Sequence, residues 1–230
     1  MSLPLSGLVV LELAGLAPAP MAGMILSDFG ARVIRVDRVV DGLAVSAGPD
    51  MLARGKLSIA IDLKLAAGVA LFKELASRCD ALIEPFRPGV MERLGLGPET
   101  LLASNPRLIY ARLTGFGQGG DPAYSGAAGH DANYLAVSGM LSLLRQSSDS
   151  DDLGLTNKPF APNSLLGDMA GGGLLCATGV LLALLERGRS GKGQVIDAAM
   201  ADGVSYLGTT LFRSANAGKL RWGLGDVGEN

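Results

Sequence analysis

Short runs of aliphatic and β-branched residues alternate along the chain with segments whose apolar positions recur at helical spacing. The run Leu8–Leu13 predicts a buried strand, and Arg32–Val36 predicts a second one. Between them, Met21–Phe29 predicts a helix with Pro20 at its first position, which Gly30 ends. A strand, a helix and a strand in this order form a βαβ unit, and its right-handed crossover makes the two strands parallel.

The same alternation continues to the carboxyl-terminal part of the chain. Further strands are predicted over Leu57–Leu63, Ala81–Glu84, Leu108–Leu113 and Gln194–Asp197, and further helices over Gly68–Arg78, Pro98–Ala103, Leu174–Leu185 and Ala199–Ala215. In the first of these strands Leu57, Ile59, Ile61 and Leu63 alternate with other residues, so one face is expected to be buried. Val39–Ala53 and Gln146–Lys158 are predicted as loops. The pattern indicates an α/β fold, a Rossmann-like parallel sheet with flanking helices, whose ligands bind beyond the carboxyl ends of the strands.

An acidic residue, Asp37, follows the second strand of the βαβ unit, an arrangement typical of dinucleotide-binding folds. Gly15, Gly23 and Gly30 do not have the GxGxxG spacing, however, so NAD is not the expected ligand. Arg38 instead indicates an adenosine that carries a phosphate, because a guanidinium group binds phosphate and stacks on adenine. A solvated surface arginine is the alternative interpretation of Arg38.

Two polar residues stand out among apolar segments. His130, the chain's single histidine, lies in Gly129-His130-Asp131, directly before a predicted helix that Asp131 is expected to cap. Histidine is the usual general base near neutral pH, and a hydrogen-bonded structural histidine is the alternative. Asp168 precedes the long apolar helix, either as its N-cap or as a carboxylate beside which Gly171–Gly173 leave room for a substrate.

The composition narrows the class of protein. The 230 residues are 48% apolar but only 5% aromatic, so small and aliphatic side chains fill the core, and 33 glycines predict many close backbone approaches. A net charge of −2 makes no electrostatic case for binding nucleic acid or an anionic membrane. The uncharged run Met169–Leu185 is shorter than the ~20 apolar residues that a membrane-spanning helix needs, which predicts a buried core helix.

The cysteines and the amino terminus bear on the compartment. Cys79 and Cys176 have no CxxC spacing and are interpreted as small buried hydrophobic residues in a reducing compartment. The first residues lack the basic segment of a secretory signal. A cytoplasmic location is therefore expected, or a mitochondrial or peroxisomal one in a eukaryote.

Several motifs together carry a resemblance to a known family. They are Leu8–Pro20, Arg35-Val36-Asp37-Arg38, Arg54-Gly55-Lys56, Ile61-Asp62-Leu63-Lys64, Glu84–Pro98, Leu108–Gln118, Gly129-His130-Asp131 and Gly191–Ala198. In this combination the chain resembles the family III CoA-transferases over nearly its whole length. Val39, where the family often has proline, and the acidic loop Gln146–Lys158 depart from the family pattern.

The resemblance implies site residues and a domain division. His130 and Asp168 correspond to the family's proton-transfer pair. The residues that correspond to its CoA-thioester contacts are Arg38, Ile61, Asp62, Leu63, Lys64, Gly129, Asp131, Ala132, Asn133 and Tyr134; Arg87 and Arg93 are additional candidates for phosphate contacts. Residues 1–200 are expected to form the CoA-binding large domain, and residues 201–230 a helix and linker toward a second, small domain that is absent from this chain.

Gly129-His130-Asp131 resembles the racemase branch of the family, which inverts the α-carbon of 2-methylacyl-CoA thioesters. This implies that one residue removes the α-proton and the other returns a proton to the opposite face, with backbone amides at a glycine-rich helix start stabilising the enolate. The partner would be an acyl-CoA thioester, with no metal or other cofactor, and full-length relatives form interlocked homodimers. Two alternatives are a CoA-transferase with Asp168 as covalent acyl carrier, and a CoA-binding fragment without turnover, whose exposed apolar helices would favour association.

Overall fold

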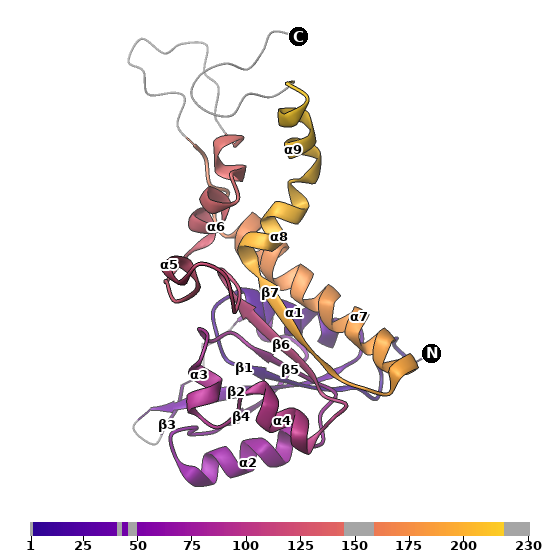
Figure 1. The fold of residues 1–230 in the computed structure, drawn as a ribbon. Coiled ribbons are helices and arrows are strands. Elements are labelled where there is room, and N and C mark those ends of the chain that lie inside the picture. The colour runs from indigo at the N-terminus through magenta and orange to yellow at the C-terminus, as the bar shows by residue number, and fades with distance from the viewer. Residues whose placement is uncertain (1, 41–42, 46–49, 145–158, 219–230) are drawn as a thin grey trace.

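In the computed structural model the chain forms one twisted parallel sheet between two layers of helices (Figure 1). The structure describes residues 2–40, 43–45, 50–144 and 159–218. The parallel strands are β1 (Val9–Leu13), β2 (Arg32–Val40), β4 (Leu57–Ala60), β5 (Ala81–Glu84), β6 (Ile109–Thr114) and β7 (Gln194–Ala199). Their order in space is β4-β2-β1-β5-β6-β7, and the short β3 (Leu43–Val45) pairs antiparallel to β2. The predicted Rossmann-like α/β fold is confirmed.

The strand order places a topological switch point between β1 and β5. From β1 the chain proceeds outward to β2 and β4, and from β5 it proceeds in the other direction to β6 and β7. In such a sheet the two connections leave neighbouring strands on opposite faces, which opens a crevice outside the carboxyl ends of those strands. The switch point is therefore where a ligand site is expected.

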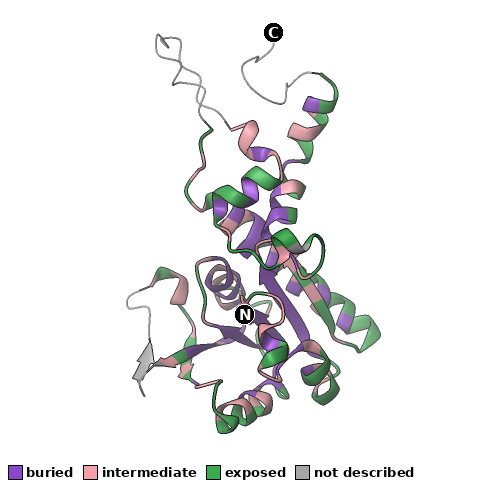
Figure 2. Cartoon of the chain, turned by 60° about the vertical axis from the view of Figure 1, so that its left-hand side comes forward, coloured by how far each residue is buried: buried purple, intermediate pink, exposed green. Residues whose placement is uncertain are grey.

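Each face of the sheet has its own hydrophobic core, because successive side chains of a strand point to opposite faces. Val10 and Ile83 face a core shared with α1 (Pro18–Asp28) and α7 (Leu175–Ser190). Leu11 and Leu82 face a second core. The helices on that side are α2 (Ala66–Ala76), α3 (Val90–Arg93) and α4 (Pro98–Ser104). Figure 2 shows the strands as a buried band between helices whose outer sides are exposed.

Apart from the short 3-10 helix η1 (Met51–Ala53), which contacts α1, the remaining helices surround the carboxyl ends of the strands or extend away from the sheet (Figure 1). They are α5 (Pro122–Ser125), α6 (Asp131–Val137), α8 (Met200–Leu207), α9 (Thr209–Asn216), the short 3-10 helix η2 (Met140–Ser142), and the π-helix η3 (Leu165–Leu174). The helix predicted over 199–215 is thus two helices. They meet at Gly208, where a Cβ would lie 2.6 Å from the sulfur of Met140.

Other boundaries also differ from the prediction. Helix α1 begins at Pro18, a position where proline loses no helical hydrogen bond, rather than at Pro20. β3 and η1 lie inside the segment predicted as a loop. The strand predicted over 57–63 ends at Ala60. The expected buried face is confirmed at Ile61, which is buried, and at Ile59 and Leu63, which pack against the second core; it is wrong only at Leu57, which is 56% exposed. The predicted loop Gln146–Lys158 lies outside the described residues.

The long apolar helix begins earlier than predicted. η3 and α7 form one helix of 26 residues from Leu165 to Ser190, whose most apolar 18-residue window has a mean hydropathy of 1.7 and is 39% buried. Within the described part of the chain it alone has the length and composition to cross a membrane. It contacts α1, β6 and β7 and buries Cys176, Val180 and Ala183 against them, as a core helix does.

Candidate active site

A cavity of about 330 Å³ lies at the carboxyl ends of β1, β5 and β6, at the switch point. Segments that follow each of these strands line it, together with residues from the start of α6, from η3 and from α8. The lining residues are Leu16, Pro18, Ala19, Pro85, Phe86, Arg87, Pro88, Leu113, Thr114, Gly115, Phe116, Ser125, Ala127, Ala128, Gly129, His130, Tyr134, Asp168 and Met200. The structure thus brings His130 and Asp168, which are far apart in the sequence, to one cavity.

His130 lies at the start of α6 and is exposed to the cavity. Its backbone conformation is extended, and its N–H donates to Oδ1 of Asn133 at 2.9 Å. His130 is therefore the N-cap residue, and the expectation that Asp131 caps this helix is wrong. Because the N-cap is the last residue with non-helical backbone before the helix, the imidazole is attached to a fixed point at the cavity wall.

Asp168 is half-buried and lies within the first turn of η3, whose N-cap is Ser164. The expectation that Asp168 itself is the N-cap is therefore wrong. Burial raises the pKa of Asp168, and the negative charge of Asp131 raises it further, against a hydrogen bond from Ser164 and the charge of His130. A larger fraction of this carboxyl group is therefore protonated at a given pH than in an ordinary aspartate.

The three glycines after Asp168 serve helix packing. A Cβ on Gly171 would lie 2.9 Å from the backbone nitrogen of Val204, and one on Gly173 would lie 2.8 Å from the carbonyl oxygen of Pro18. All three glycines are buried against α1 and α8. The interpretation that they leave room for a substrate is therefore wrong.

Asp131 joins the two catalytic candidates. Its Oδ1 accepts the backbone N–H groups of Gly167 at 2.6 Å and of Asp168 at 2.9 Å. These amides at the start of the glycine-rich helix thus donate to a side chain of the protein, and are not the free enolate donors that the sequence suggested. No sequence signal links Asp131 to Gly167, because the two lie 36 residues apart.

An aromatic wall borders the cavity beside His130. The Tyr134 hydroxyl donates to the carbonyl oxygen of Gly129 at 2.7 Å, and the Tyr134 ring meets Phe116 edge-on at 5.2 Å between centroids. A Cβ on Gly115 or Gly129 would lie within 2.7 Å of the Tyr134 ring, so only glycine allows this approach. Burial, and then the carboxylates of Asp168 and Asp131, raises the pKa of Tyr134 to about 12, which keeps the hydroxyl a donor.

The CoA-contact candidates fall into three groups. The cavity is lined by Gly129, Tyr134 and Arg87. The first turn of α6 contains Asp131, Ala132 and Asn133, which do not line the cavity. The others stand outside the cavity: exposed Arg38 at the end of β2, exposed Arg93 on α3, and Ile61, Asp62, Leu63 and Lys64 after β4. Ile61 is only 4% exposed.

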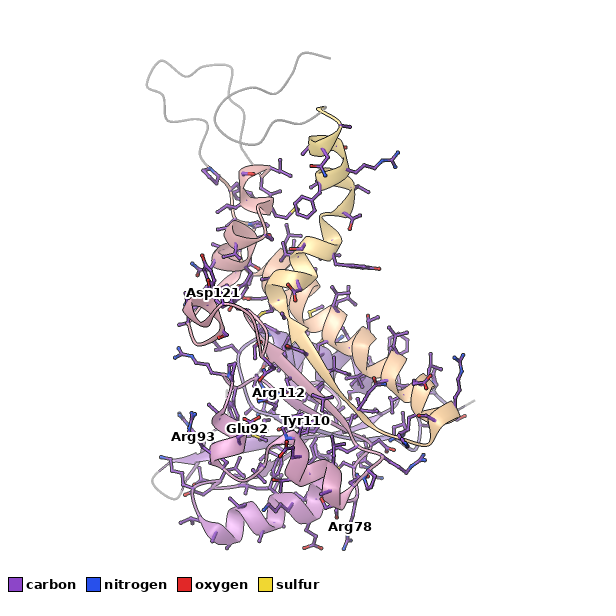
Figure 3. All side chains as sticks on the ribbon, viewed as in Figure 1. Arg78, Glu92, Arg93, Tyr110, Arg112 and Asp121 are labelled. Atoms are coloured by element: carbon purple, nitrogen blue, oxygen red, sulfur yellow. The ribbon has the colours of Figure 1, made fainter. Side chains whose placement is uncertain are left out.

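A buried ion network supports the turn that carries Arg87. Arg112 Nε donates to Oε1 of Glu84 at 3.0 Å, and Oε2 of Glu84 accepts the Phe86 N–H at 2.9 Å. Arg112 also pairs with Glu92 of α3 at 2.8 Å (Figure 3). Burial raises the pKa of Glu84, opposed by these same hydrogen bonds and the Arg112 charge. No sequence pattern pointed to this network, which joins β5 to β6.

Possible metal ligands are scattered over the described part of the chain. Across residues 2–40, 43–45, 50–144 and 159–218, no group of three or more histidine, cysteine, aspartate and glutamate side chains is arranged to hold a metal ion. The cavity has one histidine and one carboxylate among its lining residues.

The chain is similar in sequence to two kinds of curated protein, racemases and CoA-transferases. The alpha-methylacyl-CoA racemase of Mus musculus is 52% identical over 214 residues, which are 93% of this chain and 52% of that protein. The racemase of the same name from Homo sapiens is 52% identical over 210 residues, 91% of this chain and 51% of that protein. The succinyl-CoA--D-citramalate CoA-transferase of Chloroflexus aurantiacus is 37% identical over 89% of this chain and 51% of its own length. The chain therefore spans about half the length of the curated relatives it matches.

Solved structures share the fold. A CAIB/BAIF family protein from Brucella suis superposes with a TM-score of 0.82 and 31% identity, covering 100% of this chain and 62% of the other. Rv3272 from Mycobacterium tuberculosis superposes with a TM-score of 0.77 and 33% identity, covering 94% and 60%. The sequence model of CoA-transferase family III matches residues 5–225. Because the family model matches nearly the whole chain and the fold is shared with solved members, the chain belongs to CoA-transferase family III.

Proposed function

We propose that this chain carries the proton-transfer site of an alpha-methylacyl-CoA racemase, an isomerase that interconverts the R and S forms of 2-methylacyl-CoA thioesters. The observation that carries the proposal is the meeting of His130 and Asp168 at one cavity at the switch point of the sheet. The 52% identity to racemases, against 37% to a CoA-transferase, favours racemisation over CoA transfer.

The chemistry needs one basic and one acidic group on opposite sides of the α-carbon. His130, exposed at the cavity wall, removes the α-proton, and the protonated Asp168 returns a proton to the other face. The raised pKa of Asp168 supports its role as the acid in this direction, because it increases the protonated fraction. In the reverse direction the two groups exchange roles.

The cavity suits an apolar acyl group. Its apolar lining residues are Leu16, Phe86, Leu113, Phe116 and Met200. Arg87 also lines the cavity and would supply a cation for a phosphate of the CoA. The remainder of the CoA would extend along the carboxyl edge of the sheet toward Arg38 and the segment after β4, with Arg93 as a further phosphate contact. In this proposal CoA is part of the substrate, and the reaction uses no other cofactor.

CoA transfer between carboxylates is the second candidate. Asp168 lines the cavity, and its carboxylate could attack the thioester carbonyl, breaking the C–S bond and expelling CoA as the thiolate, to give a mixed anhydride. Return of the thiolate to the aspartyl carbonyl would release the acid and leave an aspartyl-CoA thioester. Trapping with hydroxylamine separates the two functions, because an aspartyl thioester gives a hydroxamate at Asp168 and a proton-transfer site does not.

The wider biological setting belongs to the same proposal. Residues 1–200 would form the CoA-binding domain and residues 201–230 would lead toward a further domain; full activity is expected of an interlocked homodimer. A cytoplasmic location is proposed, or a mitochondrial or peroxisomal one in a eukaryote. A chain that only binds CoA esters is the remaining alternative.

Exchange of the α-proton tests the proposal. The protein is incubated in D₂O with a 2-methylacyl-CoA, and loss of the α-proton signal is followed by NMR for wild type, His130→Ala and Asp168→Ala. Each substitution is expected to slow exchange by about 10²–10⁴-fold, the usual contribution of a general acid or base. The exposed Arg78, which follows α2 and pairs with Glu74 on the surface, supplies the control Arg78→Ala. Wild-type protein that binds the thioester without exchange would refute the racemase function of this chain.

A further inference from the structure

Asp131 is a buried carboxylate between the two catalytic candidates. It follows His130 in the sequence, is 5% exposed, and its Oδ1 accepts the amides of Gly167 and Asp168. Its Oδ2 is buried and has no hydrogen-bond partner among the described residues. A buried carboxylate with one unpaired oxygen costs free energy, so this one calls for an explanation beyond packing.

The two accepted amides belong to the first turn of η3, where backbone N–H groups have no acceptor within the helix. The chain reaches this turn through Asn163 and Ser164, whose φ angles are 32° and 64°. Residues other than glycine rarely adopt that region. A Cβ on Gly167 would lie 2.9 Å from Asp131 Oδ1, so the approach of the two elements also needs a glycine. The start of η3 is therefore bound to the start of α6 through one side chain.

Few other polar groups act on Asp168. Asp131, His130 and Tyr134 face it from α6, and Ser164 hydrogen-bonds to it from its own helix. The other elements packed against η3 are α1, α7, α8 and β7. α1 and α8 present Pro18, Met21 and Met200 to its glycine face. The charged residues that these elements carry are Asp28, Glu186, Arg187, Arg189, Asp197 and Asp202. The negative charge beside Asp168 thus comes from Asp131.

We propose that Asp131 is a positioning residue: it holds the main chain at Asp168 against the start of α6, so that Asp168 and His130 reach the same carbon atom. The catalytic role of Asp131 rests on the proposed proton transfer. The contact between Asp131 and η3 does not, since its hydrogen bonds exist whatever the reaction is. A second effect follows from the charge, because a neighbouring negative carboxylate keeps Asp168 protonated to higher pH.

Two substitutions separate the hydrogen bonds from the charge. Asp131→Asn keeps an oxygen acceptor for both amides and removes the negative charge, whereas Asp131→Ala removes both. The matched control is Asp50→Asn, because Asp50 also accepts a helix-start amide, that of Leu52 at 2.9 Å, outside the cavity.

Two readouts do not depend on turnover. The amide protons of Gly167 and Asp168 should exchange with solvent about tenfold faster or more in Asp131→Ala, as expected for a lost hydrogen bond, and little faster in Asp131→Asn. Titration of the Asp168 carboxyl carbon by NMR should show a lower pKa in Asp131→Asn. Asp50→Asn should leave both unchanged.

The activity readout connects the inference to the reaction. Asp131→Ala should lower kcat for α-proton exchange by about 10²-fold with little change in KM, since a misplaced acid slows the chemistry rather than binding. In Asp131→Asn the pH limb that reports Asp168 should move to lower pH. Unchanged amide exchange in Asp131→Ala, or an unchanged Asp168 titration in Asp131→Asn, would overturn the inference. If Asp131→Ala does not fold, the titration of Asp168 in Asp131→Asn decides whether the inference holds. A wild type without α-proton exchange refutes the proposed function but leaves both NMR readouts decisive for Asp131.

Discussion

Glu12 in β1 is fully buried and depends on a cation from another part of the chain. Lys56 Nζ donates to Glu12 Oε2 at 2.6 Å and to the carbonyl oxygen of Pro20 at 2.7 Å. Burial raises the pKa of Glu12 and lowers that of Lys56, while their attraction opposes both changes. The pair sits where α1 approaches the sheet closely, since a Cβ on Gly23 would overlap the Glu12 carboxylate.

Removing one partner of this pair should destabilise the fold strongly. Lys56→Ala leaves the buried Glu12 carboxylate without its hydrogen-bonded cation, which costs about 3–5 kcal/mol in comparable pairs. The exposed pair of Arg78 and Glu74 supplies the contrast: Arg78→Ala should cost about 0.3–0.5 kcal/mol. Urea denaturation followed by circular dichroism measures both, and equal losses in the two variants would contradict the prediction.

At the scale of elements, backbone contact between helices shapes the site. Gly203 of α8 lies against Gly171 of η3 so closely that a Cβ on Gly203 would be 2.0 Å from the Gly171 carbonyl oxygen. The wide turn of a π-helix is often found at functional sites, and here it carries Asp168. The position of the carboxyl group is therefore tied to the packing of α8.

Gly203→Ala should separate these helices. We expect a loss of about 1–3 kcal/mol in the free energy of unfolding, the usual cost of overpacking, together with slower α-proton exchange. Gly188→Ala in α7 is the matched control, since nothing lies within 4 Å of its added Cβ. There alanine should be neutral or stabilise by up to about 1 kcal/mol, because alanine favours helix. Thermal melts that rank the two variants in the opposite order would contradict this account.

At the scale of the whole molecule, the described part of the chain leaves apolar surface uncovered. Leu182 and Leu185 on α7 are 61% and 68% exposed, and Val195 on β7 and Tyr206 on α8 are exposed as well. Large exposed apolar side chains favour contact with another protein surface where they lie together, as Leu182 and Leu185 do three residues apart on α7.

The isolated chain should therefore self-associate. Sedimentation velocity over a range of concentrations is expected to show growing assemblies for the wild type, and fewer for Leu182→Gln combined with Leu185→Gln. The substitution Leu65→Gln, at an exposed leucine outside α7, is the control and should leave the distribution unchanged. A wild type that stays monomeric throughout would show that this surface does not drive association.

The agreement between prediction and structure is greatest where the signal is local. The strand predicted over Ala81–Glu84 has the same bounds in the structure, because a short apolar run that ends before a proline specifies a buried strand in many surroundings. The isolated cysteines are predicted to be buried, and Cys79 and Cys176 are free and buried. Burial raises the pKa of each thiol to about 12.

Local patterns and residue chemistry were enough to predict the alternation of strands and helices, the α/β class, and the two candidate groups, His130 and Asp168. Only the tertiary structure shows which residue caps α6, that η3 is a π-helix packed through glycines, and that Asp131 accepts the backbone N–H groups of the first turn of η3. The physical reason is the same for the last two features. They depend on contacts between segments far apart in the chain, and no local pattern records the distance between such segments once the chain has folded.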